Sequence, residues 1–156
     1  INDNIFCVHG GITGFVKSRR ELMRIQKVSS KSSLFVNGSV QADFLWNDPD
    51  PTIQMYGMSP RQMGHTFGKK ILNDFRNNLN FDIVIRGHEM EVNGYNWPFG
   101  KNGGILTIFS APNYCGGKNG SAVAVVKNDG NVDVEQIVPY TNTANAIGNL
   151  NDIRFM

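Results

Sequence analysis

Two short apolar runs in this sequence each end in a histidine beside a glycine. The run FCV precedes His9, and the run DIVIRG precedes His88. Apolar runs of this length predict buried strands, and the ends of such strands present side chains at the rim of a sheet. Neutral imidazoles at a rim are good ligands for a divalent transition metal. Two imidazoles are nevertheless too few to hold a catalytic metal without further ligands.

The length and composition fit one ordinary globular domain. The chain has 156 residues, of which 40 % are hydrophobic and 18 % charged, with a formal charge of +2. The basic residues are scattered apart from 17–27, which we interpret as the exposed face of a short helix, so no nucleic-acid partner is expected. The longest apolar stretch falls short of about 18 residues, so no membrane association is expected. Cys7 and Cys115 lack zinc-type spacing and favour reduced thiols in an intracellular protein of the cytoplasm, the nucleus or both.

The order of the predicted elements indicates an α/β (α+β) fold, a mixed β-sandwich flanked by helices. The predicted elements are strands at Ile5–Val8, Asp82–Arg86, Gly94–Phe99 and Ile105–Phe109, a hairpin of Ser121–Lys127 and Val132–Val138, and helices at Ser18–Lys27 and Thr66–Asn78. Val28–Val40 is expected to form an exposed loop, and the prolines of NDPDP are expected to exclude regular structure. Residues 1–138 are expected to form one domain and residues 139–156 a loosely held tail. Because the chain opens with Ile1 directly before a core strand, we expect it to be a piece of a longer protein.

Several side chains are candidates for a site, each with a structural alternative. His9 and His88 are metal ligands or hydrogen-bonded core histidines. Arg61 follows Ser-Pro just ahead of a predicted helix, whose start attracts anions; its guanidinium either holds phosphoryl oxygens or lies free on the surface. Asp48 either orients a basic group or caps its own turn. Tyr114 either offers its hydroxyl to a ligand or packs its ring.

Six motifs taken together resemble a known family. They are FCVHGGI, FLWNDPD, GMSPR with GHTFG, RGHE, GYNW and FSAPNYC, in this order. Between about residues 4 and 127 the chain resembles the C-terminal half of the catalytic domain of the metal-dependent serine/threonine phosphoprotein phosphatases, which include calcineurin. The SPR turn and GYNW are most similar to the type 2A branch. The resemblance implies a metallophosphoesterase-like sandwich, incomplete at its N-terminal side, that hydrolyses phosphoproteins.

The resemblance also implies a role for each candidate residue. His9 and His88 would be ligands of one of two divalent metal ions (manganese, iron or zinc), which together activate a water. Arg61 would bind the substrate phosphate, Tyr114 would line the site, and Asp48 would support the substrate-facing loop. The implied partners are phosphoserine and phosphothreonine proteins and regulatory subunits.

The sequence departs from the family at several points. Gln62, Met63 and His65 replace the Gly-Ala and Tyr of the type 2A branch, and residues 116–119 differ from its pattern. The upstream motifs G-D-x-H-G, G-D-x-x-D-R-G and G-N-H-E, which carry the other metal ligands and the general acid, are not found in the 156 residues. The chain alone is therefore predicted to be inactive. Two interpretations stay open: a piece of a two-metal phosphatase, or a non-catalytic truncated paralogue that acts as a binding module.

Overall fold

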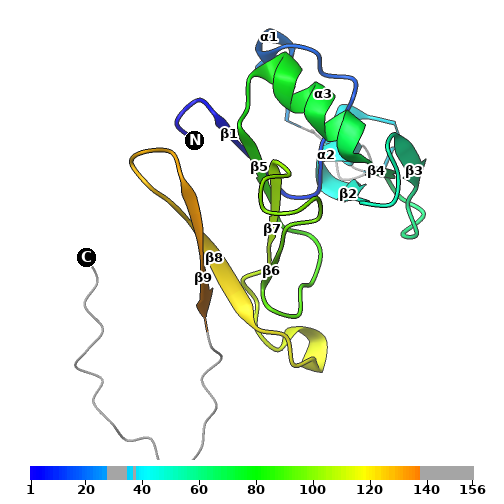
Figure 1. Cartoon of the computed structure of the whole chain (residues 1–156). Coiled ribbons are helices and arrows are strands. Elements are labelled where there is room, and N and C mark those ends of the chain that lie inside the picture. The colour runs from blue at the N-terminus through cyan, green and yellow to red at the C-terminus, as the bar shows by residue number, and fades with distance from the viewer. Residues whose placement is uncertain (28–34, 37, 138–156) are drawn as a thin grey trace, which may run out of the picture.

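The computed structural model describes residues 1–27, 35–36 and 38–137 of the chain. This part contains a four-stranded sheet, a three-stranded sheet and a two-stranded hairpin, with short helices between them (Figure 1). The mixed α/β class is thereby confirmed. The predicted tail at 139–156, most of the predicted loop at Val28–Val40 and the last residue of the predicted hairpin, Val138, lie outside the described residues.

The four-stranded sheet has three parallel strands and one antiparallel strand at its edge. Its order is β1 (Ile5–Val8), β5 (Ile83–Arg86), β7 (Ile105–Ile108) and β6 (Tyr95–Asn96), with β6 antiparallel to β7. The predicted bounds of the strands are confirmed to within one residue, except at Gly94–Phe99. There only two residues pair, because Pro98 lacks an amide donor and the strand ends before it. Since β1 and β5 are parallel neighbours, the residues that follow them lie at the same edge.

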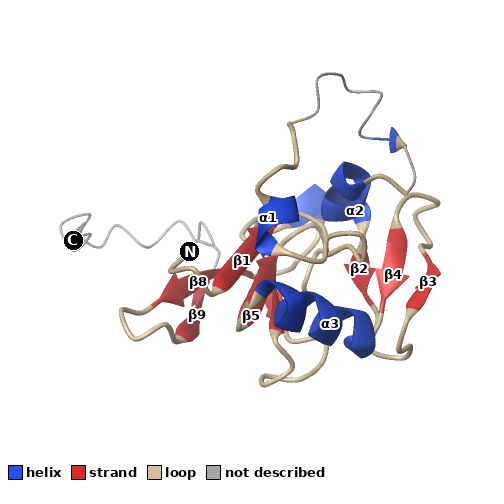
Figure 2. Ribbon diagram, turned by 90° about the horizontal axis from the view of Figure 1, so that it is seen from above, coloured by secondary structure: helices blue, strands red, loops and turns tan. Residues whose placement is uncertain are grey.

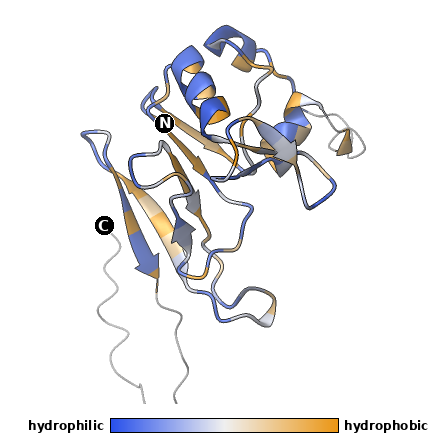
Figure 3. Cartoon of the chain, turned by 45° about the vertical axis from the view of Figure 1, so that its right-hand side comes forward, coloured by the Kyte–Doolittle hydropathy of each residue, from blue (hydrophilic) through white to orange (hydrophobic). Residues whose placement is uncertain are grey.

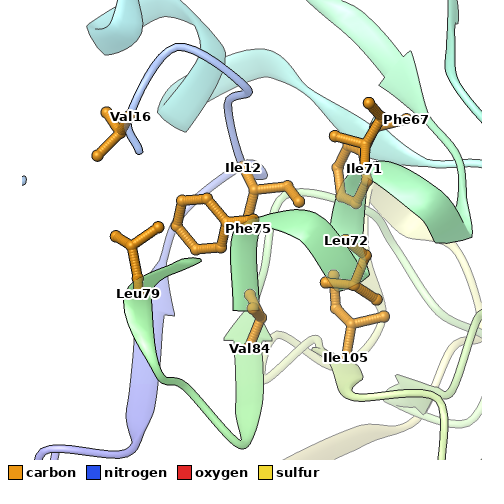
Figure 4. Close-up of a cluster of buried hydrophobic side chains, with 9 residues drawn as sticks. All are labelled: Ile12, Val16, Phe67, Ile71, Leu72, Phe75, Leu79, Val84 and Ile105. Atoms are coloured by element: carbon orange, nitrogen blue, oxygen red, sulfur yellow. The ribbon is translucent and has the colours of Figure 1, made fainter. Parts of the chain in front are cut away.

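The main hydrophobic core lies between this sheet and α3 (Lys69–Leu79). The helix has a hydrophilic outer face (Figure 3), and its last turn ends at Asn80, whose φ of 56° is left-handed. The predicted apolar face is confirmed, but the predicted start at Thr66 is wrong because Thr66 and Phe67 pair as a strand. The core side chains in Figure 4 are Ile12, Val16, Phe67, Ile71, Leu72, Phe75, Leu79, Val84 and Ile105.

A second sheet contains part of the NDPDP segment. Its order is β2 (Asp48–Pro49), β4 (His65–Phe67) and β3 (Tyr56–Met58). The prediction that the prolines exclude regular structure is wrong at Asp48–Pro49, which pairs parallel with β4. Pro49 is tolerated because β2 is an edge strand, where a missing N–H leaves no ladder bond unmade. This sheet and the β8–β9 hairpin (Ser121–Val126 and Val132–Ile137) lie on opposite sides of the molecule (Figure 2).

Two short helices differ from the sequence-based expectation. The first, α1, spans Arg19–Leu22 and is shorter than the predicted helix at Ser18–Lys27, because it buries no residue of its own. The second, α2, spans Val40–Trp46 and was not predicted, since its seven residues are too few to show a helical period. None of the helices in the described part of the chain has the length and hydrophobicity that a bilayer span requires.

Replacing Ser39 by alanine should lower the free energy of unfolding by about 1 kcal/mol. The Ser39 hydroxyl caps α2 by accepting a hydrogen bond from the Ala42 amide at 3.1 Å. Urea unfolding measures the loss, and Ser39→Asp, which retains a capping oxygen, should stay within a few tenths of a kcal/mol of wild type. Equal losses in both variants would contradict the role of the cap.

Candidate functional site

The structure brings His9 and His88 into contact at one edge of the four-stranded sheet. Val8 and Arg86 are register partners in β1 and β5, and the Gly87 amide donates to the His9 carbonyl at 3.0 Å. His88 Nδ1 lies 3.2 Å from His9 Nε2, and the ring centroids are 5.0 Å apart. The parallel pairing therefore places two predicted ligands side by side.

The surroundings of His88 keep its imidazole neutral. Its φ of 71° lies in the left-handed region, a strained conformation that is enriched at functional sites. Burial lowers the pKa of His88 to about 4, against an opposing effect of the Asp48 charge. Its Nε2 is buried and has no hydrogen-bond partner among the described residues. A neutral imidazole with an unpartnered nitrogen is the form that binds a metal.

Asp48 lies between two guanidinium groups. Its Oδ2 accepts from Arg61 Nε at 2.8 Å and its Oδ1 from Arg86 Nη2 at 2.6 Å. The carboxylate is 6 % exposed, and His88 Nε2 lies 4.0 Å from its Oδ1. Asp48 thereby links the turn that carries Arg61 to the strand that precedes His88.

Arg86 is a site residue that the sequence reasoning missed. Its side chain is fully buried, pairs with Glu89 at 2.7 Å, and donates from Nε to the Gly10 carbonyl at 2.5 Å. Burial, followed by the charge of Asp48, raises the pKa of Glu89. A charged residue at the end of a buried strand requires a counter-charge. The arginine that ends the apolar run before His88 is therefore the sequence feature that could have identified Arg86 as a site residue.

The two glycines after His9 allow the chain to pass directly against α2 and β2. A Cβ on Gly10 would lie 2.3 Å from the Leu45 carbonyl carbon, and one on Gly11 would lie 2.5 Å from the Asn47 carbonyl oxygen. Only glycine permits such approaches. The contact therefore sets the position of His9 relative to the segment that carries Asp48.

Arg61 lies elsewhere than the sequence predicted. Helix α3 begins at Lys69, so Arg61 belongs to the turn between β3 and β4, and the predicted effect of a helix start on it is wrong. Its side chain is 40 % exposed. Together with Asp48 and Glu89 it lines an open cavity of about 450 Å³. A guanidinium at the wall of a cavity can receive an anion.

Tyr114 is set apart from this group. It lies in the 3-10 turn η2 (Tyr114–Gly116), which Figure 1 shows in yellow, away from α2 and β2. Its ring packs against Phe109 with centroids 5.1 Å apart, and its amide donates to Asn119 Oδ1 at 2.8 Å. In the described ranges no hydrogen bond or ring contact joins Tyr114 to the four other predicted residues, so its role toward a ligand stays a prediction.

The comparisons with known proteins show the family of the chain. The family model for calcineurin-like phosphoesterases matches residues 1–92, a range that includes His9, Asp48, Arg61 and His88. The chain belongs to the calcineurin-like phosphoesterase family. This result also confirms the resemblance to the metal-dependent phosphatases that the motifs indicated.

Two proteins similar to this calcineurin-like phosphoesterase chain are serine/threonine phosphatases. The catalytic subunit of serine/threonine-protein phosphatase 4 of Candida glabrata is 36 % identical over 150 residues, which are 96 % of this chain and 46 % of that protein. A solved serine/threonine phosphatase of Saccharomyces cerevisiae, described as similar to human phosphatase PP5, aligns with a TM-score of 0.73 and 26 % identity over 88 % of this chain and 45 % of its own. The chain thus spans about half the length of these relatives.

The donor atoms present fit part of a metal site of this calcineurin-like phosphoesterase family, which uses divalent metals. His9 and His88 offer adjacent imidazoles, with His88 Nδ1 and His9 Nε2 3.2 Å apart. Among the described residues no group of three or more histidine, cysteine, aspartate or glutamate side chains is arranged to hold a metal. The described residues therefore offer two adjacent imidazoles to a metal, and their role as ligands stays a prediction.

As the pH rises above about 4, the wild-type protein should lose folding stability that the variant Asp43→Asn keeps. Burial raises the pKa of Asp43 from 3.8, so the folded protein holds the proton of this carboxyl group more tightly than the unfolded chain does. The stability gained from that proton is complete below pH 3.8 and is lost as the pH rises through the folded-state pKa. Over that window the stabilities of variant and wild type should diverge by up to about 1.4 kcal/mol per pH unit, in favour of the variant. Urea unfolding at several pH values measures the difference, and parallel pH curves would contradict it.

Proposed function

We propose that this chain is part of a metal-dependent serine/threonine phosphoprotein phosphatase. The observation that carries the proposal is Arg61, held by Asp48 at the wall of an open cavity of about 450 Å³, close to the paired imidazoles of His9 and His88. A fixed guanidinium beside neutral imidazoles joins a phosphate-binding group to metal ligands. The names of the two similar phosphatases support the assignment.

Each of these side chains has a defined task in the proposed reaction. His9 and His88 hold a divalent ion (manganese, iron or zinc), and the family site uses two such ions. When bound, the metals would supply an activated water and would neutralise charge on the phosphoryl group. Arg61 binds and orients the phosphoryl oxygens, and Asp48 holds its guanidinium in place. Arg86 pairs with Asp48 from the buried side and supplies the counter-charge at this 6 % exposed position.

We further propose that the remaining metal ligands and the general acid come from sequence outside these 156 residues. The chain covers 46 % of its Candida relative, which leaves room for them. The substrates are proteins that carry phosphoserine or phosphothreonine, and regulatory subunits select among them. The site of action is the cytoplasm, the nucleus or both, where the free thiols of Cys7 and Cys115 stay reduced.

The decisive experiment compares the 156-residue chain with the longest protein that its genomic locus encodes. Both are incubated with a phosphoserine peptide and manganese, iron or zinc, and released phosphate is measured. The longer protein should release phosphate with a dependence on metal that a chelator abolishes, and the chain alone should not. No release from the longest encoded protein with any of the three metals would overturn the proposal in favour of a non-catalytic binding module.

Calorimetry tests the metal site of the chain directly. Two imidazoles without a carboxylate bridge should bind manganese weakly, because a stable site needs more ligands and supporting hydrogen bonds. Tight one-to-one binding of manganese to the 156-residue chain would contradict the proposal that the other ligands lie outside it.

A further inference from the structure

Asn47 lies at the junction of α2 and β2, directly before Asp48. It is fully buried, and its amide closes α2 by donating to the Asp43 carbonyl at 3.1 Å. Its φ of −70° and ψ of 139° turn the chain from helix to strand. Any movement of Asn47 is therefore passed on to the next residue, which holds Arg61 and Arg86.

The side-chain amide of Asn47 joins two further segments. Its Nδ2 donates to the carbonyl of Ile12, in the loop after β1, at 2.8 Å. Its Oδ1 accepts from the backbone amide of His65, the first residue of β4, at 2.7 Å. The backbone carbonyl of Asn47 also accepts from Arg86 Nη2 at 3.3 Å. One buried residue thus fastens the loop after His9, the start of β2 and the start of β4.

Two glycines allow the backbone to approach Asn47 closely. A Cβ on Gly64, whose φ is 67°, would lie 2.8 Å from Asn47 Oδ1, and one on Gly11 would lie 2.5 Å from the Asn47 carbonyl oxygen. The two hydrogen bonds require one donor and one acceptor at fixed positions, which an amide provides. A carboxylate lacks the donor, and an aliphatic side chain of similar size lacks both.

We propose that Asn47 is a positioning residue, which holds Asp48 at the place where the carboxylate engages both Arg61 and Arg86. Asn47 acts through Asp48 and does not itself touch the substrate. The structural part of this inference stands on the hydrogen bonds, and its consequence for catalysis rests on the proposed phosphatase function.

The variant Asn47→Asp of the 156-residue chain tests the inference within one molecule. Position 47 faces the Asp43 carboxyl, to which the native side chain is hydrogen-bonded, and the Arg86 guanidinium. Burial and the Asp43 carboxyl raise the pKa of the new carboxyl group, and Arg86 opposes them. At about pH 5 its neutral form can donate to the Ile12 carbonyl and accept from the His65 amide as the native amide does.

At about pH 8 the ionised form faces the Ile12 carbonyl without a proton. The Nη2 hydrogens of Arg86, which donate to Asp48 Oδ1 and are followed by NMR, should then exchange about tenfold faster than in wild type at the same pH. At the lower pH they should exchange at the wild-type rate.

Asn47→Leu is the matched control, because it has similar size and no hydrogen-bonding group. It should show the faster exchange at both pH values. The inference is overturned if exchange at Arg86 in the leucine variant equals that of wild type. It is equally overturned if exchange in the aspartate variant does not return to the wild-type rate at the lower pH. This includes the case in which that variant is unfolded at both pH values. A role in packing alone predicts no dependence on the proton of the new carboxyl group.

A second measurement uses the longest protein that the locus encodes. There Asn47→Asp should raise the KM for a phosphoserine peptide about tenfold near pH 8, with a smaller change in kcat, because Arg61 binds the phosphate in the ground state. A kcat loss with unchanged KM would contradict the positioning of Arg61. If the wild-type protein released no phosphate, the proposed function would fail, whereas the NMR result on Arg86 would still decide the structural inference.

Discussion

Replacing His88 by alanine should reduce metal-dependent phosphate release by about a thousandfold or more in the longest protein that the locus encodes. His88 supplies a neutral imidazole whose Nδ1 lies 3.2 Å from His9 Nε2, and the proposal makes its ring a metal ligand together with that of His9. A bound metal contributes several kcal/mol of transition-state stabilisation, and each 1.36 kcal/mol corresponds to about a factor of ten in rate. Initial rates of phosphate release with saturating manganese measure the effect.

Two companion variants separate the loss of a ligand from a loss of fold. Asparagine tolerates the positive φ of 71° at position 88 better than alanine does, so His88→Asn should lose activity without added backbone strain. Cys7→Ala, at an exposed position in β1, should keep the wild-type rate. Circular dichroism checks that all three variants are folded, and a wild-type rate in either His88 variant would refute its assignment as a ligand.

Replacing Asp48 by alanine should lower the free energy of unfolding by about 3–5 kcal/mol. The reason is the Arg86 side chain, which is 0 % exposed and loses the closer of its two carboxylate partners. Removing Asp48 leaves a buried guanidinium that water does not reach and that Glu89 alone compensates. Arg61 loses its partner as well, but its 40 % exposure lets water replace the lost contact. Urea unfolding of the 156-residue chain measures the change.

Asp74→Ala is the matched control for this prediction. It removes an aspartate from an exposed pair with Lys70 on α3, and that pair has nearly the same length, 2.7 Å. An exposed pair at this helical spacing contributes about 0.3–0.5 kcal/mol. A further variant that combines Asp48→Ala with Arg86→Met should recover part of the loss, because the fully buried guanidinium is then absent. Similar losses in the Asp48 and Asp74 single variants would show that burial of the pair does not matter.

The elements that the sequence predicted well are those with a long or repeated local pattern. The apolar face of α3, the strands that become β1, β5 and β7, and the hairpin of β8 and β9 all show a period or a turn signal within a few residues. The apolar side chains of α3, β1, β5 and β7 lie in the core or pack against it, as that period requires.

The elements that it missed are short and depend on distant partners. Strands β2, β3 and β4 have two or three residues each and exist through pairing with one another, and α2 has seven residues. A segment of that length carries too little pattern to be recognised alone. The same limit explains why Arg61 was predicted to lie just before a helix. The helical period was extended over residues that form β4 in the structure.

The sequence by itself determined the family and the two imidazoles at the sheet edge. His9 and His88 follow apolar strands, and parallel neighbouring strands end at the same edge. The tertiary structure alone decided that Asp48 pairs with both Arg61 and Arg86, that Asn47 fastens three segments, and that Tyr114 lies apart. The physical reason is that buried charges and amides are stable only where distant segments supply their partners within hydrogen-bond distance. Those distances arise from packing and leave no local pattern in the chain.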